Sequence, residues 1–116
     1  MNICSILEDQ NTENRISITP EIAKKYISLG LKVCLPENYG VHLGFKDNEF
    51  KDAGVEISKD ENEILKKSDI IIQMGLLSDE KLSLIKENQT IVGVLNPYNN
   101  KDKIQKLSKK KLMFFL

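Results

Sequence analysis

The chain has 116 residues, with 17 basic and 17 acidic side chains, one histidine and a net charge of zero at neutral pH. This length suits a single domain, and the balanced charge argues against a nucleic-acid partner, so the lysines near the end indicate a solvated helix face. No secretory signal and no apolar run long enough for a bilayer are recognisable, which predicts a cytosolic or cytosol-facing domain.

Strand and helix patterns alternate along the chain. The predicted strands cover residues 2–7, 31–35, 55–57, 69–74, 90–95 and 112–116. The predicted helices cover residues 20–29, 47–53, 61–67, 79–87 and 101–109. Ile70, Ile71 and Ile72 form a continuous apolar run, which is typical of a strand covered on both faces. The alternation predicts an α/β fold with a doubly wound parallel sheet of the flavodoxin/Rossmann type.

Several helix ends carry local signals. Thr19 is the expected N-cap of the first helix, and Gly30 is expected just past its end. Asp47 and Ser78 are the expected N-caps of two later helices. The spacing of apolar residues in the first helix places Leu29 on its buried face.

The two cysteines, Cys4 and Cys34, both fall in predicted strands. A disulfide between them is possible if the two strands are neighbours. Isolated cysteines among apolar residues are more often buried free thiols, and we favour that interpretation.

Familiar catalytic and phosphate-binding motifs are absent from the sequence. Gly40 and Gly44 lie in one loop, but their spacing is not that of a dinucleotide-binding turn. No Walker loop, metal-ligand cluster or nucleophile elbow is recognisable either. His42 lies in the same polar loop, and we interpret it as an exposed residue without a catalytic role.

Three polar positions follow predicted strands, where α/β proteins gather their ligand contacts. Arg15 follows the first strand, Gln73 ends the fourth and Asn96 follows the fifth. A guanidinium pairs with carboxylates or phosphates, and a carboxamide hydrogen-bonds a nicotinamide or a ribose. The alternative is structural: Arg15 braces its loop against Glu8 or Glu13, and the two amides serve the fold.

Several short motifs are spread in order along the chain. They are Glu8, Glu13-x-Arg15-Ile16-x-Ile18-Thr19-Pro20, Leu29-Gly30-Leu31-Lys32-Val33, Gly40 and Phe50-x-x-Ala53-Gly54-Val55. Together they resemble the opening of the alanine dehydrogenase/pyridine nucleotide transhydrogenase family. Leu7 stands where that family typically has a lysine.

The fourth and fifth strands distinguish the two branches of that family. Alanine dehydrogenases end the fourth strand with Lys-Val-Lys-Glu-Pro, whose second lysine holds the keto acid, and place an acid/base histidine after the fifth. This sequence has Gln73, Gly75 and Leu77 at the first, second and proline positions, and Asn96 at the histidine. The side chain of a glycine cannot hold a carboxylate, and an asparagine cannot shuttle a proton. The resemblance therefore implies the alpha subunit of a proton-translocating NAD(P) transhydrogenase.

That resemblance carries expectations for the whole protein. It implies that residues 1–116 form the N-terminal lobe, that a Rossmann domain follows beyond residue 116, and that NAD(H) lies between the two. Arg15, Gln73 and Asn96 would belong to this lobe's wall of the cleft. Hydride would pass from NADH to NADP⁺ with Re/Si specificity, and the lobe alone would be inactive. The implied partners are NADP(H)-binding and membrane subunits and a second alpha subunit, which places the protein peripherally on the inner face of the plasma membrane.

Two alternatives remain at this point. One is an oxidoreductase of the alanine dehydrogenase type, and the other is a non-catalytic flavodoxin-like binding module. The apolar strand predicted at 112–116 would leave an uncovered surface if it ended a domain. We therefore expect the chain to be the front part of a longer protein.

Overall fold

The fold is built on a parallel sheet. The computed structural model describes residues 1–8, 15–75, 78–86, 88–93 and 112–115. Within these ranges the sheet has six parallel strands, β1 (Asn2–Cys4), β2 (Lys32–Pro36), β3 (Glu56–Ser58), β4 (Ile70–Gln73), β5 (Thr90–Gly93) and β6 (Leu112–Phe115). Their order is β3-β2-β1-β4-β5-β6, so the direction of winding reverses between β1 and β4. The predicted parallel sheet is confirmed, and its strands differ from the predicted ranges only at their ends.

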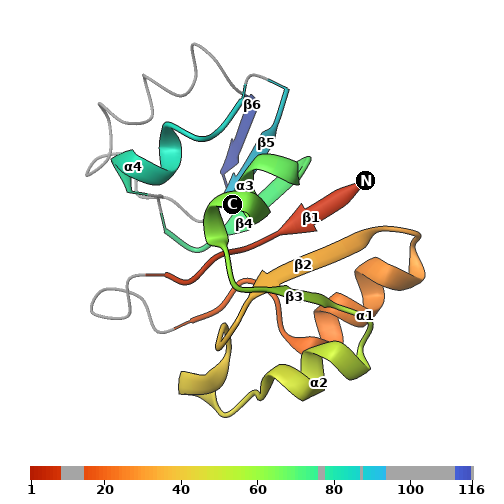
Figure 1. Ribbon diagram of the computed structural model, residues 1–116. Coiled ribbons are helices and arrows are strands. Elements are labelled where there is room, and N and C mark those ends of the chain that lie inside the picture. The colour runs from red at the N-terminus through yellow and green to blue at the C-terminus, as the bar shows by residue number, and fades with distance from the viewer. Residues whose placement is uncertain (9–14, 76–77, 87, 94–111, 116) are drawn as a thin grey trace.

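Helices cover both faces of the sheet. The helices are α1 (Pro20–Ser28), α2 (Asp47–Asp52), α3 (Glu61–Lys67), α4 (Asp79–Leu82) and the 3₁₀-helix η1 (Val41–Leu43). Figure 1 shows α1 and α2 together on one side of the strands, with α3 across from them. The doubly wound arrangement is therefore confirmed. The predicted helix at 101–109 lies outside the described residues, and η1 was not predicted.

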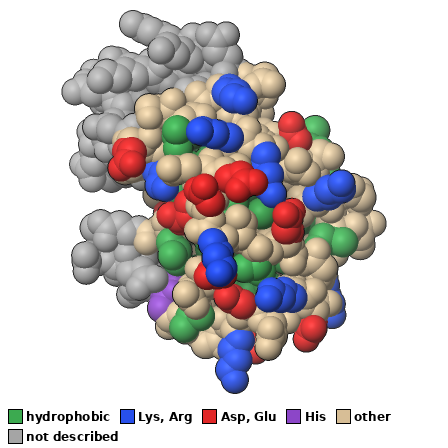
Figure 2. All heavy atoms as spheres, in the orientation of Figure 1, with side chains coloured by type: hydrophobic (Ala, Val, Ile, Leu, Met, Phe, Trp, Pro, Cys, Tyr) green, Lys and Arg blue, Asp and Glu red, His purple; other side chains and the backbone are tan. Residues whose placement is uncertain are grey.

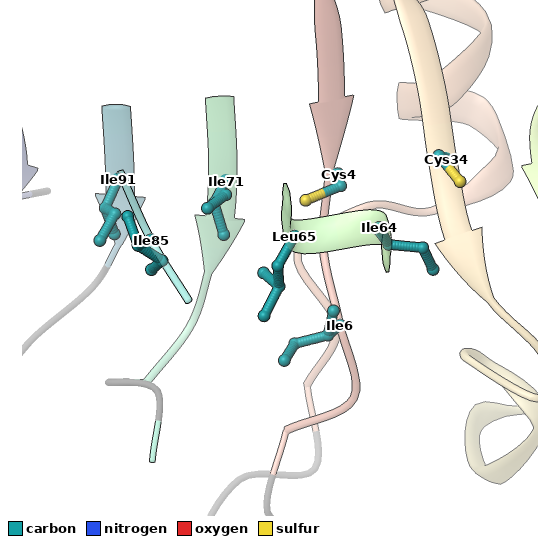
Figure 3. Close-up of a cluster of buried hydrophobic side chains, with 8 residues drawn as sticks. All are labelled: Cys4, Ile6, Cys34, Ile64, Leu65, Ile71, Ile85 and Ile91. Atoms are coloured by element: carbon teal, nitrogen blue, oxygen red, sulfur yellow. The ribbon is translucent and has the colours of Figure 1, made fainter. Parts of the chain in front are cut away.

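One apolar cluster lies between the sheet and α3 (Figure 3). Its buried members are Cys4, Ile6, Cys34, Ile64, Leu65, Ile71, Ile85 and Ile91. Ile64 and Leu65 are the two fully buried residues that α3 contributes. Ile71 points to this side, whereas Ile70 and Ile72 pack on the opposite face. The continuous apolar run of β4 is thus used on both faces, as predicted.

The second cluster lies under α1 and α2. Its buried members are Ile3, Ile18, Ala23, Val33, Leu35, Tyr39, Phe50 and Val55. Gly40 is buried where two aromatic side chains leave no room for another. A Cβ there would lie 2.9 Å from Phe45 Cβ and 3.1 Å from Phe50 Cε2. This close contact explains the glycine in the loop after β2.

The helix-end signals were mostly correct. Thr19 Oγ1 accepts a hydrogen bond from the Ile22 N–H at 3.3 Å, and Ser78 Oγ accepts one from Lys81 N–H at 3.3 Å. Gly30 has a φ of 89°, the left-handed conformation expected just after a helix. These three predictions are confirmed.

Three local predictions were wrong. Asp47 does not cap α2: its carboxylate accepts the Asn38 N–H, and Lys46 occupies the N-cap position. Leu29 is 75% exposed, because α1 ends at Ser28 and the chain turns away from the sheet. The helix predicted at 79–87 ends at Leu82, where the Ser83 hydroxyl donates to the Glu80 carbonyl and competes with the helical pattern.

The two cysteines are free and buried, as favoured from the sequence. They are direct register partners on β1 and β2, so the condition set for a disulfide, neighbouring strands, is met without a bond being formed. Burial raises the pKa of the Cys4 thiol to about 12, which keeps it protonated and unreactive. Both thiols therefore act as small apolar side chains of the core.

Candidate functional site

The candidate site lies at the carboxyl ends of β1 and β4. These strands are neighbours, yet the connections that follow them wind in opposite directions. In open α/β sheets such a reversal leaves a crevice between the two loops, and ligands bind there. Residues 5–8 follow β1, and Gln73–Gly75 end β4 or follow it.

Gln73 is buried in this region, with 3% of its surface exposed. Its Oε1 accepts hydrogen bonds from Ser5 Oγ at 2.8 Å and from the Ile6 N–H at 2.7 Å. Its Nε2 donates to the Ile6 carbonyl at 3.2 Å and to Glu8 Oε2 at 2.9 Å. Since an amide oxygen accepts two bonds and an amide nitrogen donates two, the side chain has used its full capacity. Gln73 ties the end of β4 to the segment after β1.

The Glu8 carboxylate lies against the backbone that follows β4. Oε2 accepts the Met74 N–H at 2.8 Å, and Oε1 accepts the Gly75 N–H at 3.0 Å. The expectation that Gly75 cannot hold a carboxylate applied to its side chain only. Its backbone N–H does hold one, and that carboxylate belongs to this chain.

A buried tyrosine extends the network toward Arg15. The Tyr39 hydroxyl accepts the backbone N–H groups of Ser17 and Ile18, at 3.0 and 3.3 Å, and donates to Ser5 Oγ at 2.8 Å. Ser5 in turn donates to Gln73. Tyr39, Ser5, Gln73 and Glu8 therefore form one continuous hydrogen-bonded series, which we call the switch-point chain.

Every link of the switch-point chain donates in the same direction, from the Ser17–Ile18 backbone to the Glu8 carboxylate. Aligned dipoles of this kind strengthen one another at low local dielectric. Burial raises the pKa of Tyr39 despite its hydrogen bonds, so its hydroxyl keeps the proton that it donates. The switch-point chain connects the segment before α1, β1 and β4 through side chains.

A second polar contact fixes the same loop from α3. Glu61 Oε2 accepts the Leu7 N–H at 3.1 Å, and its Oε1 lies 3.6 Å from Lys81 Nζ. Lys81 also donates to Asn62 Oδ1 at 2.7 Å. Leu7, where the resemblance expected a lysine, is thus held through its backbone.

The three predicted site residues fare differently. Arg15 is exposed and lies two residues before Ser17, at the start of the segment that Tyr39 holds. Gln73 lies at the same end of the sheet but is buried and faces protein groups. Asn96 lies outside the described residues. The prediction that these residues contact a cofactor stays a prediction, and for Gln73 the contacts observed are internal.

The described residues contain no group of histidine, cysteine or acidic side chains arranged to hold a metal ion. His42 is exposed on η1. Figure 2 shows acidic and basic side chains interleaved on the face in view, without a large patch of one sign. In the ranges described, no helix has the length and apolar character needed to cross a bilayer.

Residues 6–115 match the protein family described as "Alanine dehydrogenase/PNT, N-terminal domain". The chain belongs to this family. The resemblance drawn from the short motifs is confirmed.

Relatives on both sides of the family name resemble this domain. It is 34% identical to the first of the polypeptides that make up NAD(P) transhydrogenase subunit alpha in Rickettsia prowazekii (strain Madrid E), over 99% of this chain and 31% of the relative. It is 26% identical to "Alanine dehydrogenase 1" of Staphylococcus aureus (strain bovine RF122 / ET3-1), over 92% of this chain and 28% of the relative. The domain therefore spans about a third of the length of these curated relatives.

A solved structure shows the same fold. The crystal structure of transhydrogenase from Sinorhizobium meliloti superposes with a TM-score of 0.89 at 22% identity, covering 99% of this chain and 34% of the other. The Rossmann-like α/β architecture of the family's N-terminal domain is thus confirmed for this chain.

Sequence reasoning missed two members of the domain's switch-point chain, Ser5 and Tyr39. Ser5 interrupts an apolar strand pattern, and Tyr39 is an aromatic residue inside a polar loop. Both are fully buried. A polar group that the pattern predicts to be buried needs a partner, and this signal was available in the sequence.

Proposed function

We propose that this domain is the N-terminal lobe of the NAD(H)-binding alpha subunit of an NAD(P) transhydrogenase. The relative with 34% identity carries that subunit name and supports the proposal, since the match extends over nearly the whole chain. A Rossmann domain beyond residue 116 would bind most of the nucleotide. This lobe would form the facing wall of the cleft.

The observation that carries the proposal is the reversal of winding between β1 and β4, with Arg15 exposed beside it. A cationic side chain at a switch point suits an anionic ligand such as a pyrophosphate. Ser17 adds a second group: among the described residues its Oγ is the buried side-chain atom that lacks a hydrogen-bond partner. A ligand hydroxyl or phosphate oxygen would supply that partner.

Gln73 has a supporting part in this proposal. Its amide is saturated by Ser5, Ile6 and Glu8, so we propose that it holds the wall in place from behind. Direct contact with NAD(H) would come from Arg15 and, in the sequence that follows β5, from Asn96. Direct hydride transfer between two nicotinamides needs no acid/base group, which agrees with the residues at positions 75 and 96.

The rest of the assembly follows from the same proposal. NADP(H)-binding and membrane subunits would be the partners, two alpha subunits would pair, and proton translocation with Re/Si specificity would belong to the whole complex. The lobe would then be peripheral on the inner face of the plasma membrane. An alanine dehydrogenase is the second candidate, because a relative with that name is 26% identical over most of the chain.

The test uses the complete natural protein, including whatever its coding sequence specifies after Leu116. NADH binding is measured by fluorescence titration for the wild type, for Arg15→Ala and for Lys24→Ala. Lys24 is an exposed cation on α1 and provides the matched change of charge. We expect Arg15→Ala to weaken NADH binding about tenfold, the loss of one charge-assisted hydrogen bond, and Lys24→Ala to leave it unchanged.

Two assays on the same protein separate the candidates. Reduction of an NADP⁺ analogue by NADH, in the presence of the partner subunits, supports a transhydrogenase. NAD⁺-dependent oxidation of L-alanine would support the second candidate. Absence of NADH binding by the complete protein would overturn both.

A further inference from the structure

The carboxyl end of β4 presents a set of hydrogen-bond donors that converge on one carboxylate. Met74 N–H and Gln73 Nε2 donate to Glu8 Oε2, at 2.8 and 2.9 Å, and Gly75 N–H donates to Oε1 at 3.0 Å. Two of these donors are successive backbone groups. Successive N–H groups that point to one side form a concave site for anions, and proteins use such sites to capture carboxylates.

The donors belong to the rigid part of the molecule. Gln73 ends a sheet strand that pairs with both β1 and β5, and its amide oxygen is fixed by Ser5 and Ile6. Gly75 leaves its N–H open to the incoming oxygen: a Cβ on it would lie 3.5 Å from Glu8 Oε1, in ordinary contact. The site is therefore set by β4 and Gln73, and the carboxylate is the part delivered by the loop after β1.

We propose that the end of β4 is a carboxylate-binding site that Glu8 occupies in cis. A small free monocarboxylate takes over the same three donors when the Glu8 side chain is removed. Acetate has the size and charge of the part of the glutamate side chain that an alanine lacks. The occupied site closes this end of β4 to carboxylate-bearing metabolites, whether or not the domain binds NAD(H) as proposed above.

The experiment compares Glu8→Ala with Glu49→Ala in the 116-residue chain. Glu49 is an exposed glutamate on α2 whose loss provides the matched substitution. Thermal unfolding is followed by circular dichroism at neutral pH, in sodium acetate from zero to about 0.5 M, a range chosen to reach a large excess over a weak dissociation constant. Equal concentrations of sodium chloride control for ionic strength, and acetamide controls for a neutral molecule of the same shape.

We expect Glu8→Ala to melt below the wild type and to regain about 5 °C in acetate beyond its response to chloride, as a tenfold excess over the dissociation constant would produce. The wild type and Glu49→Ala respond alike to both salts, because Glu8 fills their sites. In ¹⁵N spectra of Glu8→Ala, the amides of Met74 and Gly75 shift with acetate and saturate. Acetamide produces neither effect.

The proposal is wrong if acetate stabilises Glu8→Ala no more than chloride does, or if the shifts do not involve Met74 and Gly75. Should Glu8→Ala be unfolded in buffer, refolding in acetate is the supporting result. Glu8→Gln keeps one acceptor oxygen and serves as the second variant. If it folds while Glu8→Ala stays unfolded in acetate, free carboxylate does not replace the side chain, and the proposal is again overturned.

Discussion

Two glutamines, Gln73 and Gln89, are buried to the same extent, each with 3% of its surface exposed, and lie toward opposite ends of the strands. Gln89 precedes β5. Its Nε2 donates to the carbonyls of Leu65 and Ser68, and its Oε1 accepts the Lys86 N–H. All its partners are backbone atoms, and two of them are carbonyls at the end of α3, which helices leave without an internal partner.

Gln73 has different partners. Besides the Ile6 backbone it bonds the side chains of Ser5 and Glu8, and through Ser5 it is linked to Tyr39. Gln89 completes a helix end and goes no further, whereas Gln73 is the centre of a network that reaches the switch point. Burial and residue type do not separate a structural glutamine from one beside a site. The partners do.

The largest effect is expected for Gln73→Leu. Leucine fills a similar volume but leaves the Ser5 hydroxyl, both polar groups of Ile6 and one bond of Glu8 without their partner. We expect the free energy of unfolding to fall by about 3 kcal/mol, from several buried groups that relax only in part. Urea denaturation followed by circular dichroism measures the change.

The same variant also tests the network. We expect the Met74 and Gly75 amide signals to shift in ¹⁵N spectra, because the Glu8 carboxylate loses the Gln73 donor that helps to place it. A loss below about 1 kcal/mol would mean that the switch-point chain contributes no more than an ordinary hydrogen bond. The contrast with Gln89 would then fail.

Gln89→Leu is the second variant, with an expected loss of about 2 kcal/mol from the unpaired carbonyls of Leu65 and Ser68. Here the Met74 and Gly75 amides should not move, since no contact of Gln89 reaches them. Amide exchange in the last turn of α3 should quicken instead. A change at Gly75 in this variant would show that the two ends of the sheet are coupled.

The sequence was sufficient for the fold and for one side of this contrast. The alternation of apolar strands with capped helices predicted the parallel sheet, because each pattern depends on local spacing. It also placed Gln73 at the end of β4. It did not indicate that Gln73 faces inward, because that depends on Ser5 and Tyr39, which are 68 and 34 positions away from Gln73 along the chain.

Asp47 shows the same limit on a smaller scale. Its position favoured a helix cap, but the loop after β2 brings the Asn38 N–H within 3.0 Å, and that donor takes the carboxylate. Local patterns state what a side chain is able to do. The competing partner that tertiary structure brings close decides what it does, and short polar residues have the most such partners.

Tyr39→Phe is expected to have the smallest effect. It keeps the ring against Phe50 and removes the hydroxyl that accepts Ser17 N–H and Ile18 N–H, so we expect a loss of about 1 kcal/mol at neutral pH. Ser5 can still donate to Gln73, which is why the change is smaller than that for Gln73→Leu. Urea denaturation in parallel with the wild type measures it.

The pH dependence of that difference identifies the hydroxyl as its source. Burial raises the pKa of Tyr39 above its ordinary value of 10.0, so above this pH the unfolded chain loses its proton before the folded one does. The stability that the wild type derives from the hydroxyl is complete below the unfolded-state pKa and declines as the pH rises toward the folded-state pKa. Tyr39→Phe lacks this group, while the Cys4 and Cys34 thiols titrate in both proteins and cancel. The gap between the two proteins should therefore narrow at alkaline pH, and a gap that stays constant from about pH 8 to 11, either side of the ordinary tyrosine pKa, would mean that the phenol ionises equally in both states and is not held by the switch-point chain.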